Sequence, residues 1–446
     1  MTSPSTAQVS PQTLRKVIIA AGIGNFVEWF DFAVYGFLAT TIAQQFFPSG
    51  DPSVALLKTF AVFAVAFAFR PLGGIFFGML GDRIGRKRTL AMTILLMAGA
   101  TTLIGLLPTY AAIGVAAPIL LSLIRCAQGF SAGGEYAGAC AYLMEHAPND
   151  KRAWYGSFIP VSTFSAFAAA AVVAYALEAS LSAEAMGSWG WRLPFLIAAP
   201  LGLVGLYLRW KLDETPAFQA VKQEHAVAHS PLKETLRNHA AAICCLGAFV
   251  SLTALSFYMF TTYFATYLQV AGGLSRAAAL LVSLIALIFA AAICPLAGLY
   301  SDRVGRRATV MTACVLLMVV VYPSVLMASS GSFAASIIGV MMLAVGAVLC
   351  GVVTAALLSE VFPTRTRYTA SAITYNMAYT LFGGTAPLMA TWLISTTGSN
   401  LSPAFYLIVV ALMALAGGMA LPETSRISLH DSGAQTKTSV RSVKHC

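Results

Sequence analysis

Apolar segments long enough to cross a lipid bilayer recur from one end of this chain to the other, and they constrain its fold more than any other feature. A hydrocarbon core of ~30 Å needs about 20 apolar residues in a helix. The chain has 446 residues, of which 58% are hydrophobic and 10% are charged, whereas soluble domains carry about 25% charged residues. Because a lipid-embedded backbone must satisfy its own hydrogen bonds, we expect an all-α integral membrane protein.

Hydropathy, read with its Gly, Pro and charge breaks, predicts twelve transmembrane helices. The expected spans lie near residues 15–43, 54–80, 89–107, 112–146, 154–178, 192–211, 239–270, 276–300, 308–328, 333–361, 366–394 and 401–421. The chain then divides into a tail (1–14), an N-terminal six-helix bundle (15–211), a central loop (212–238), a C-terminal six-helix bundle (239–421) and a short tail (422–446).

Basic residues gather in the loops on one side of these spans, as at Arg15/Lys16, Arg83 to Arg88 and Arg303 to Arg307. The positive-inside rule places these loops, the central loop and both termini in the cytoplasm. The same rule explains the net charge of +10 without a nucleic-acid partner. Eight cysteines occur without CxxC spacing and mostly in apolar runs, so neither a metal site nor a disulfide framework is expected.

The two halves of the chain echo each other. GDRIGRKRT (81–89) returns as SDRVGRRAT (301–309), and LMEHAPNDKR (143–152) is echoed by LSEVFPTRTR (358–367). Each echo falls at the same place in its half. Such duplication predicts two pseudo-symmetric six-helix bundles that enclose a cleft and expose it to alternate sides of the membrane.

These repeated loops resemble the signature of the major facilitator superfamily. Within that superfamily, GNFVEWFDFAVYGF, FRPLGGIFFGMLGDRIGRKR, RCAQGFSAGGEYAGA, WGWRLPF and LDETPAF resemble the metabolite:proton symporters, which include proline/betaine, 2-oxoglutarate, citrate, shikimate and phthalate carriers. The resemblance implies a secondary active transporter of the bacterial inner membrane. It implies uptake of a small carboxylate-bearing metabolite, driven by a proton gradient without a cofactor. Osmotically regulated members carry a coiled-coil extension, whereas the tail after Glu423 shows no heptads.

The resemblance also implies that the charged ends of the repeated loops close the cytoplasmic side when the cleft faces outward. The expected gate residues are Asp82, Arg83, Arg86, Glu145, Asp302, Arg303, Arg306 and Glu360. A solvated run of charge is the alternative interpretation of the same residues.

Charged residues within the expected spans concentrate in the first half. Glu28 and Asp31 share one face of the first span with Gly24 and Tyr35, since their spacing follows the helical repeat. Arg125, Gln128 and Glu135 form a similar face of the fourth span, and Arg70 lies in the second. A charge at bilayer depth costs at least ~2.5–3.5 kcal/mol, so such residues normally face a partner or a water-filled cavity. The depths permit acid–base pairs among these three spans but do not assign them.

Related proton-linked sugar carriers pair an acid on the first span with an arginine on the fourth. By that resemblance, Asp31 is expected to carry the coupling proton with Arg125 as its partner, and Glu28 and Glu135 are alternatives. The candidates for substrate contact are Arg70, Tyr35, Gln128, Tyr258, Tyr375, Asn376 and Tyr379. Aromatic walls suit a quaternary ammonium or an aromatic acid. Structural pairing of the charges and core packing of the aromatic residues remain alternatives.

An enzyme is the competing class of protein. All six histidines lie in loops, at helix ends or in the tail, and the chain has no HExxH, GxSxG or Walker motif, so enzymatic activity is not expected. A uniporter or exchanger of the same fold remains an alternative, as does a receptor that does not transport. We expect the partners to be protons, a carboxylate or zwitterionic solute and the lipid bilayer, with the monomer as the functional unit.

Overall fold

The structure is a computed structural model that describes residues 11–48, 52–211, 231–427 and 429. Throughout these residues the regular elements are helices, and ten are long and apolar enough to cross a membrane. The other two crossings are α6 (Ala116–His146), in which polar residues lower the mean hydropathy, and the interrupted run from α18 to α19. The expected fold of twelve transmembrane helices is therefore confirmed.

The helices of the N-terminal bundle are α1 (Pro11–Phe37), α3 (Pro52–Ile84), α4 (Arg86–Leu106), α6, α8 (Phe158–Ser180) and α10 (Leu193–Trp210). Short elements join them, namely α2 (Ala39–Phe46), α5 (Tyr110–Ile113), α7 (Arg152–Gly156), α9 (Ala183–Ser188) and the 3-10 turn η1 (Gly190–Arg192).

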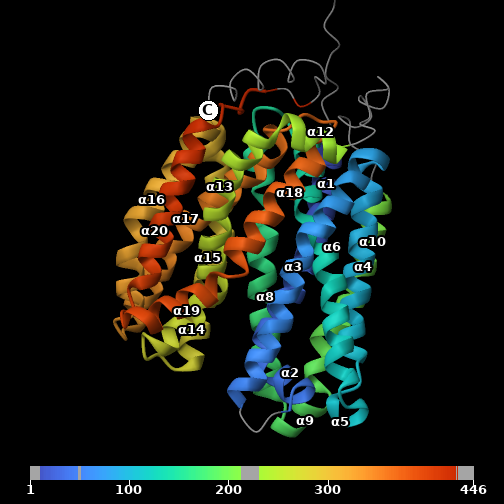
Figure 1. Ribbon diagram of the computed structural model, residues 1–446, viewed down its shortest axis with the longest axis vertical. Coiled ribbons are helices and arrows are strands. Elements are labelled where there is room, and N and C mark those ends of the chain that lie inside the picture. Colours follow the sequence, from blue (N-terminus) through green and yellow to red (C-terminus); the bar gives the residue numbers. More distant parts are fainter. Residues whose placement is uncertain (1–10, 49–51, 212–230, 428, 430–446) are drawn as a thin grey trace, which may run out of the picture.

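The C-terminal bundle begins with α12 (Pro231–Asn238), which lies at the end of the molecule where the C-terminal segment also lies (Figure 1). The crossings that follow are α13 (Ala240–Tyr258) with η2 (Met259–Tyr263) and α14 (Phe264–Val270), α15 (Arg276–Val304), α16 (Arg306–Ala328), α17 (Phe333–Glu360), α18 (Arg367–Ala378) with η3 (Tyr379–Gly383) and α19 (Ala386–Thr397), and α20 (Ser402–Ala420). The segments η2 and η3 are π-helical, a conformation that occurs frequently at functional sites.

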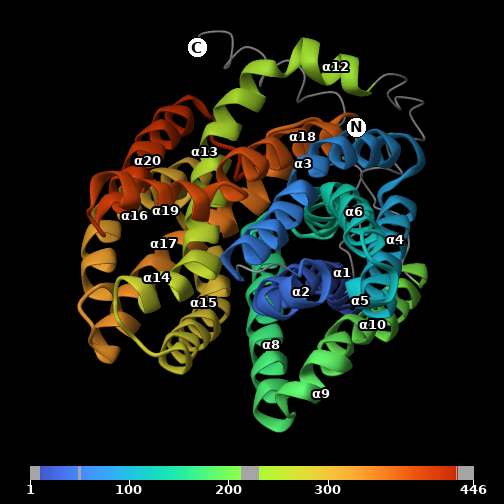
Figure 2. The same cartoon turned by 60° about the horizontal axis from the view of Figure 1, so that its bottom comes forward.

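The blue-to-green and the yellow-to-red helices form two groups that lie side by side (Figures 1 and 2). The groups meet mainly where α3 packs against α18 and where α8 packs against α15. In each contact the second crossing of one half meets the fifth crossing of the other. The contacts are therefore related by the pseudo-twofold symmetry that the sequence repeats predict.

Several expected boundaries were wrong. The first span was expected to reach residue 43, but α1 ends at Phe37 because Leu38 leaves the helical conformation, with φ −96° and ψ 11°. The second and eighth spans were expected to end near residues 80 and 300, with Asp82 and Asp302 at helix ends, and the helices continue slightly further, α3 to Ile84 and α15 to Val304. A single glycine then turns the chain, Gly85 at φ 106° and Gly305 at φ 97°. Only glycine adopts this conformation without strain. Each motif therefore consists of the end of one helix, a one-residue turn and the start of the next helix.

Candidate functional site

The acid–base face of α1 meets α3 through Glu28 and Arg70. Arg70 Nη2 donates to Glu28 Oε1 at 2.6 Å, and neither side chain is more than 1% exposed. The other guanidinium nitrogens of Arg70, Nε and Nη1, are buried and have no hydrogen-bond partner. A buried guanidinium with unused donors is costly unless an acceptor fills the gap. The site thus offers two N–H groups to a ligand.

Aromatic rings enclose the Arg70 guanidinium. Its central carbon lies 5.4 Å from the ring centre of Trp29, 5.3 Å from that of Phe32 and 5.4 Å from that of Phe67. From the other bundle, Tyr258 packs edge-on against Phe67, with ring centres 5.5 Å apart. Trp29, Phe32 and Phe67 were not predicted to line the site, since aromatic residues are common in membrane helices and their spacing carries no distinctive pattern.

Asp31 and Arg125 form a second buried pair, one helical turn from the first. Arg125 Nη1 donates to Asp31 Oδ2 at 3.1 Å, and Gln128 Nε2 donates to the same oxygen at 2.7 Å. The Arg125 guanidinium carbon lies 3.6 Å from the ring centre of Tyr35, while Asp31 Oδ1 is buried and has no hydrogen-bond partner. The predicted neighbours Asp31, Arg125, Gln128 and Tyr35 therefore lie together.

The two pairs share one aromatic ring. Phe32 lies under both guanidinium groups, 5.3 Å from Arg70 and 5.5 Å from Arg125. Glu28, Asp31 and Phe32 all belong to α1, so a shift of this helix changes both pairs at once.

The candidates on α13 and α18 lie where the bundles meet. Tyr375 stacks on Tyr136 of α6 with ring centres 4.3 Å apart, and on Tyr379 at 3.9 Å. Asn376 Nδ2 donates to Gly133 O across the interface at 2.6 Å. The hydroxyl groups of Tyr258 and Tyr375 are buried and have no hydrogen-bond partner. Arg70 thus faces a polar and aromatic wall contributed by the other half.

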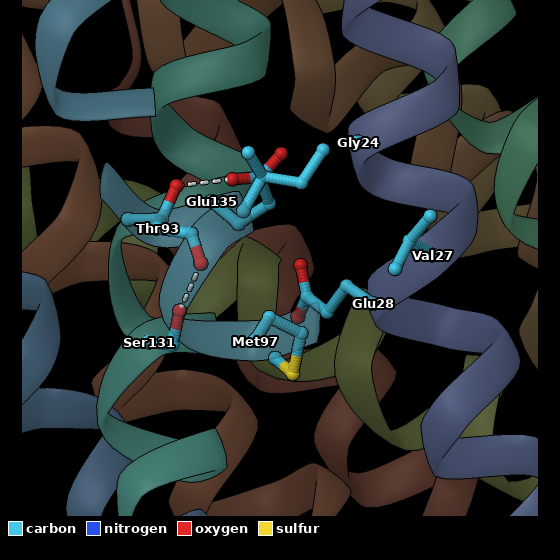
Figure 3. Close-up of a pocket in the computed structure, with 8 residues that line it drawn as sticks. Gly24, Val27, Glu28, Thr93, Met97, Ser131 and Glu135 are labelled. Carbon is cyan, nitrogen blue, oxygen red and sulfur yellow. Dashed lines mark hydrogen bonds between the residues drawn. The ribbon is translucent and has the colours of Figure 1, made fainter. Parts of the chain in front are cut away.

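Glu135 lies apart from these residues, in a narrow crevice between α1, α4 and α6 that it shares with Glu28 (Figure 3). Thr93 Oγ1 contacts Glu135 Oε2 at 2.5 Å. The sequence placed Glu135 on the same face of α6 as Arg125, and the structure brings it near Glu28 instead of Asp31.

At the end of the molecule near α12, the first repeated motif crosses from one bundle to the other. Asp82 accepts backbone N–H donors from Tyr368 at 3.1 Å and Thr369 at 2.8 Å, in the first turn of α18. Arg86 lies 3.4 Å from Glu145, and Arg367 donates to the same carboxylate at 2.6 Å. Asp82 therefore caps the N-terminus of α18 in the other half, where the helix dipole favours a negative charge.

The second motif makes the mirrored contacts. Asp302 accepts from the backbone N–H groups of Ala153 at 3.0 Å and Trp154 at 2.8 Å, in α7. Arg306 donates to Glu360 at 3.0 Å, and Arg152 of the N-terminal half reaches the same acid at 2.9 Å. We call these residues the interbundle network, namely Asp82, Arg86, Glu145, Arg152, Asp302, Arg306, Glu360 and Arg367.

Two expected gate residues, Arg83 and Arg303, are exposed at this end rather than buried in the network. Arg152 and Arg367 were not predicted as gate residues, although they are the last residues of the two echoed segments, 143–152 and 358–367. The C-terminal segment was also missed. Thr424 donates to Glu360 at 2.6 Å, and Glu423 accepts from the N–H groups of Arg306 and Arg307 at 2.9 and 3.0 Å.

Within the described residues, no group of three or more His, Cys, Asp or Glu side chains is placed to hold a metal ion.

Comparison with known proteins identifies the family. The profile of the Major Facilitator Superfamily matches residues 21–387 and 273–444 of the chain. The chain belongs to the Major Facilitator Superfamily. It is a multi-pass membrane transporter and not an enzyme.

Relatives with assigned substrates match over most of their length. The proline/betaine transporter of Salmonella typhimurium is 40% identical over 422 residues, which cover 92% of this chain and 84% of the relative. The glycine betaine/proline/ectoine/pipecolic acid transporter OusA of Dickeya dadantii matches with the same identity and coverage. The ectoine/proline transporter ProP of Corynebacterium glutamicum is 36% identical over 98% of this chain and 89% of its own length.

Solved structures share the fold. The proton:xylose symporter XylE bound to 6-bromo-6-deoxy-D-glucose superimposes with a TM-score of 0.80 at 18% identity, covering 96% of this chain and all of that one. The partially occluded inward open conformation of XylE from E. coli gives a TM-score of 0.66 at 18% identity, covering 94% of this chain and 100% of that one.

Proposed function

We propose that this transporter is a proton-coupled symporter for a small zwitterion that carries a carboxylate and a substituted ammonium group, of the proline/betaine class. The observation that carries the proposal is Arg70, a fully buried guanidinium with two unused N–H groups and aromatic rings around it. The relatives named as proline, betaine and ectoine transporters support the choice of substrate class.

The substrate carboxylate accepts a charge-assisted hydrogen bond from one of the free donors of Arg70, Nε or Nη1, which lie on different edges of the guanidinium. The ammonium group then lies against the rings at the bundle interface. Tyr258 and Tyr379 have ring centres 6.1 Å apart, and Trp29 lies 6.3 and 6.4 Å from them. A cation over such ring faces gains ~0.5–2 kcal/mol or more when desolvated. An aromatic acid fits the rings but leaves their attraction for a cation unused.

Coupling to the proton resides in the Asp31–Arg125 pair. Asp31 accepts hydrogen bonds from Arg125 and Gln128 at Oδ2, an arrangement that favours its ionised form, and its partner-free Oδ1 is the position at which a proton attaches. Protonation removes the attraction that holds Arg125. Both arginines pack on Phe32 of α1. Release of Arg125 from Asp31 and binding of the substrate carboxylate to Arg70 therefore both change the contacts of this helix.

Alternating access follows from the interbundle network. The network holds the two halves together at one end, which we propose is the cytoplasmic end, with both termini on that side. The conformation described here is then closed to the cytoplasm. Loading of substrate and proton favours rocking of the bundles and loss of these contacts. A proton gradient drives the cycle of a functional monomer of the inner membrane, and no cofactor takes part.

Uptake into proteoliposomes tests the proposal. We would measure radiolabelled proline, glycine betaine, 2-oxoglutarate, citrate and phthalate, each with and without an inward proton gradient, for the native chain and for Asp31→Asn. We expect gradient-driven accumulation of proline or betaine that is lost in Asp31→Asn while counterflow exchange persists. Glu184→Gln, an exposed acid on α9, is the matched control.

Accumulation that persists in Asp31→Asn would remove the coupling proton from Asp31. Equilibration without accumulation in the native chain would identify a uniporter or exchanger.

A further inference from the structure

Pro71 interrupts the backbone hydrogen bonds of α3 directly after Arg70. Proline has no N–H group, so it cannot donate to the carbonyl oxygen four residues back, which is that of Phe67. Lipid supplies no water to replace the lost donor, and membrane helices that contain proline satisfy the freed carbonyl from neighbouring helices or Ser/Thr side chains. The Phe67 carbonyl is therefore open to a donor from another part of the chain.

Thr380 of the opposite bundle donates to this carbonyl. Its Oγ1 lies 2.9 Å from the carbonyl oxygen of Phe67, although the two residues are 313 positions apart in sequence. Because a threonine hydroxyl carries one hydrogen, a donor to α3 does not donate to its own helix. Other threonines of the same crossing donate to the carbonyl four residues back in their own helix, namely Thr374, Thr385, Thr391 and Thr397.

The π-helical segment η3 places Thr380 at this contact. The N–H group of Gly384 donates to the carbonyl of Tyr379, five residues back, at 2.8 Å. This wider turn rotates the residues of η3 relative to those of an uninterrupted α-helix. Gly384 also packs on the Phe67 side chain, since a Cβ added at this glycine would lie 3.2 Å from the ring. The backbone and the ring of Phe67 thus both contact the same turn of the other half.

The turn of α3 held by Thr380 carries part of the substrate site. The Phe67 ring centre lies 5.4 Å from the guanidinium carbon of Arg70 and 5.5 Å from the ring centre of Tyr258. Phe67 and Arg70 are three residues apart, so they lie on one face of α3. The helices α3 and α18 lie side by side (Figures 1 and 2), and the bond from Thr380 exists only while the two bundles meet here.

We propose that Thr380 is a positioning residue of the substrate site, which fixes the turn of α3 that carries Phe67 and Arg70 when the two bundles meet. Its role in transport rests on the zwitterion site proposed above. When the bundles separate, the Phe67 carbonyl loses this donor, and the turn before Pro71 loses a restraint. Arg70 is then held less firmly against the aromatic wall. Tight binding of the solute is thereby linked to closure of the halves around it.

Uptake of glycine betaine into proteoliposomes tests the positioning role. Thr380→Val removes the hydroxyl with little change of shape and should raise the KM about tenfold, because it leaves a carbonyl without its donor beside Arg70. The maximal rate should change much less than the KM, and Thr380→Ser, which keeps the donor, should stay close to native. Thr391→Val is the matched control, since this hydroxyl is exposed and donates within its own helix. Equal effects of Thr380→Val and Thr380→Ser overturn the proposal.

A second substitution separates this hydrogen bond from general packing. Pro71→Ala gives α3 its own N–H donor to the Phe67 carbonyl. Thr380→Val should therefore raise the KM less in the Pro71→Ala background than in the native chain, a coupling that a double-mutant cycle measures. The same increase in both backgrounds overturns the proposal. If Pro71→Ala does not fold, the comparison of Thr380→Val with Thr380→Ser decides.

Thermal unfolding of the substrate-free full chain in detergent follows the same cycle without transport. We expect Thr380→Val to lower the unfolding midpoint of the native chain more than that of Pro71→Ala. If the native chain takes up neither betaine nor proline, the proposed function fails and the substrate role of Thr380 fails with it. The unfolding cycle still decides whether Thr380 holds the Phe67 carbonyl, so the two failures are distinguishable.

Discussion

Among single residues, Tyr258 and Tyr375 of the C-terminal bundle present aromatic rings to the Arg70 site, and their buried hydroxyl groups have no hydrogen-bond partner. Tyr258 is 3% exposed, and its hydroxyl has no hydrogen-bond partner. If the ring attracts an ammonium group, Tyr258→Phe should leave the KM for glycine betaine within about twofold of native. Tyr258→Leu removes the quadrupole and should raise KM about tenfold, which corresponds to ~1.4 kcal/mol of cation–π attraction. Initial uptake rates over a range of betaine concentrations measure this. A larger effect of Phe than of Leu would mean that the hydroxyl, and not the ring, contacts the substrate.

Part of the buried charge pairing was predictable from the sequence. Helical periodicity placed Glu28 and Asp31 on one face of α1, and the resemblance to sugar carriers suggested Arg125 for Asp31. The structure brings both pairs together. The Glu28–Arg70 pair could not be assigned, because it depends on how α1 and α3 are rotated about their axes. One sequence contains no measure of that rotation.

At the scale of elements, small residues set the distance between α3 and α6. A Cβ added at Gly133 would overlap the carbonyl oxygen of Arg70, and one added at Gly129 would overlap that of Ala66. Gly133→Ala should therefore separate the helices or strain them, at ~1–3 kcal/mol. Thermal unfolding in detergent measures the loss. Gly99→Ala on α4 is the control, since a Cβ there meets nothing within 4 Å. A Gly133→Ala protein as stable as Gly99→Ala would show that α3 and α6 are not tightly apposed.

The C-terminal segment caps α16, and this contact depends on pH. Burial raises the pKa of the Glu423 carboxyl, but backbone N–H groups of Arg306, Ser425 and Arg307 outweigh it and hold the pKa below its usual 4.5. A carboxyl with a depressed pKa stabilises the fold above its unfolded pKa, and the contribution is lost as the pH falls through the folded value. Glu423→Gln should cost about 0.5–1 kcal/mol at neutral pH, at the low end for a cap because the side chain is exposed.

Thermal unfolding of the native chain and of Glu423→Gln, at neutral pH and below about pH 3, measures this difference. The two proteins should converge at acid pH. A constant difference across the pH range would mean that shape rather than charge makes the contact.

Helix existence was predictable here, whereas helix ends were not. Mean hydropathy located the crossings, but two of them were expected to end near residues 80 and 300. The helices continue to Ile84 and Val304, and a single positive-φ glycine then completes each turn. The π segments η2 and η3 leave no mark in hydropathy. They adjoin Tyr258 and begin at Tyr379, so the elements that position the aromatic wall were those that the sequence could not reveal.

At the scale of the whole molecule, the repeat in the sequence becomes a repeat of contacts between the halves. The network pairs each acid of one motif with the backbone of the opposite bundle, and each motif arginine with a glutamate that also binds an arginine from that bundle. The resemblance predicted which loops take part. It could not predict Arg152 and Arg367, since their partners lie about 208 and 222 residues away in sequence.

Breaking this network should open the end that it closes. Removing one partner of a buried ion pair costs ~3–5 kcal/mol, and a shift of about 5.5 kcal/mol moves a two-state equilibrium from 1:99 to 99:1. Arg152→Gln and Glu145→Gln should therefore each shift the population toward the open state, and the double variant should shift it further. Spin labels at Arg88 and Ala308, exposed equivalent positions in the first turns of α4 and α16, report the separation of the halves. Longer label distances in both variants, with Glu184→Gln unchanged, are the expected result. Unaltered distances in the double variant would mean that apolar packing of α3 on α18 and of α8 on α15 holds this end shut without the charges.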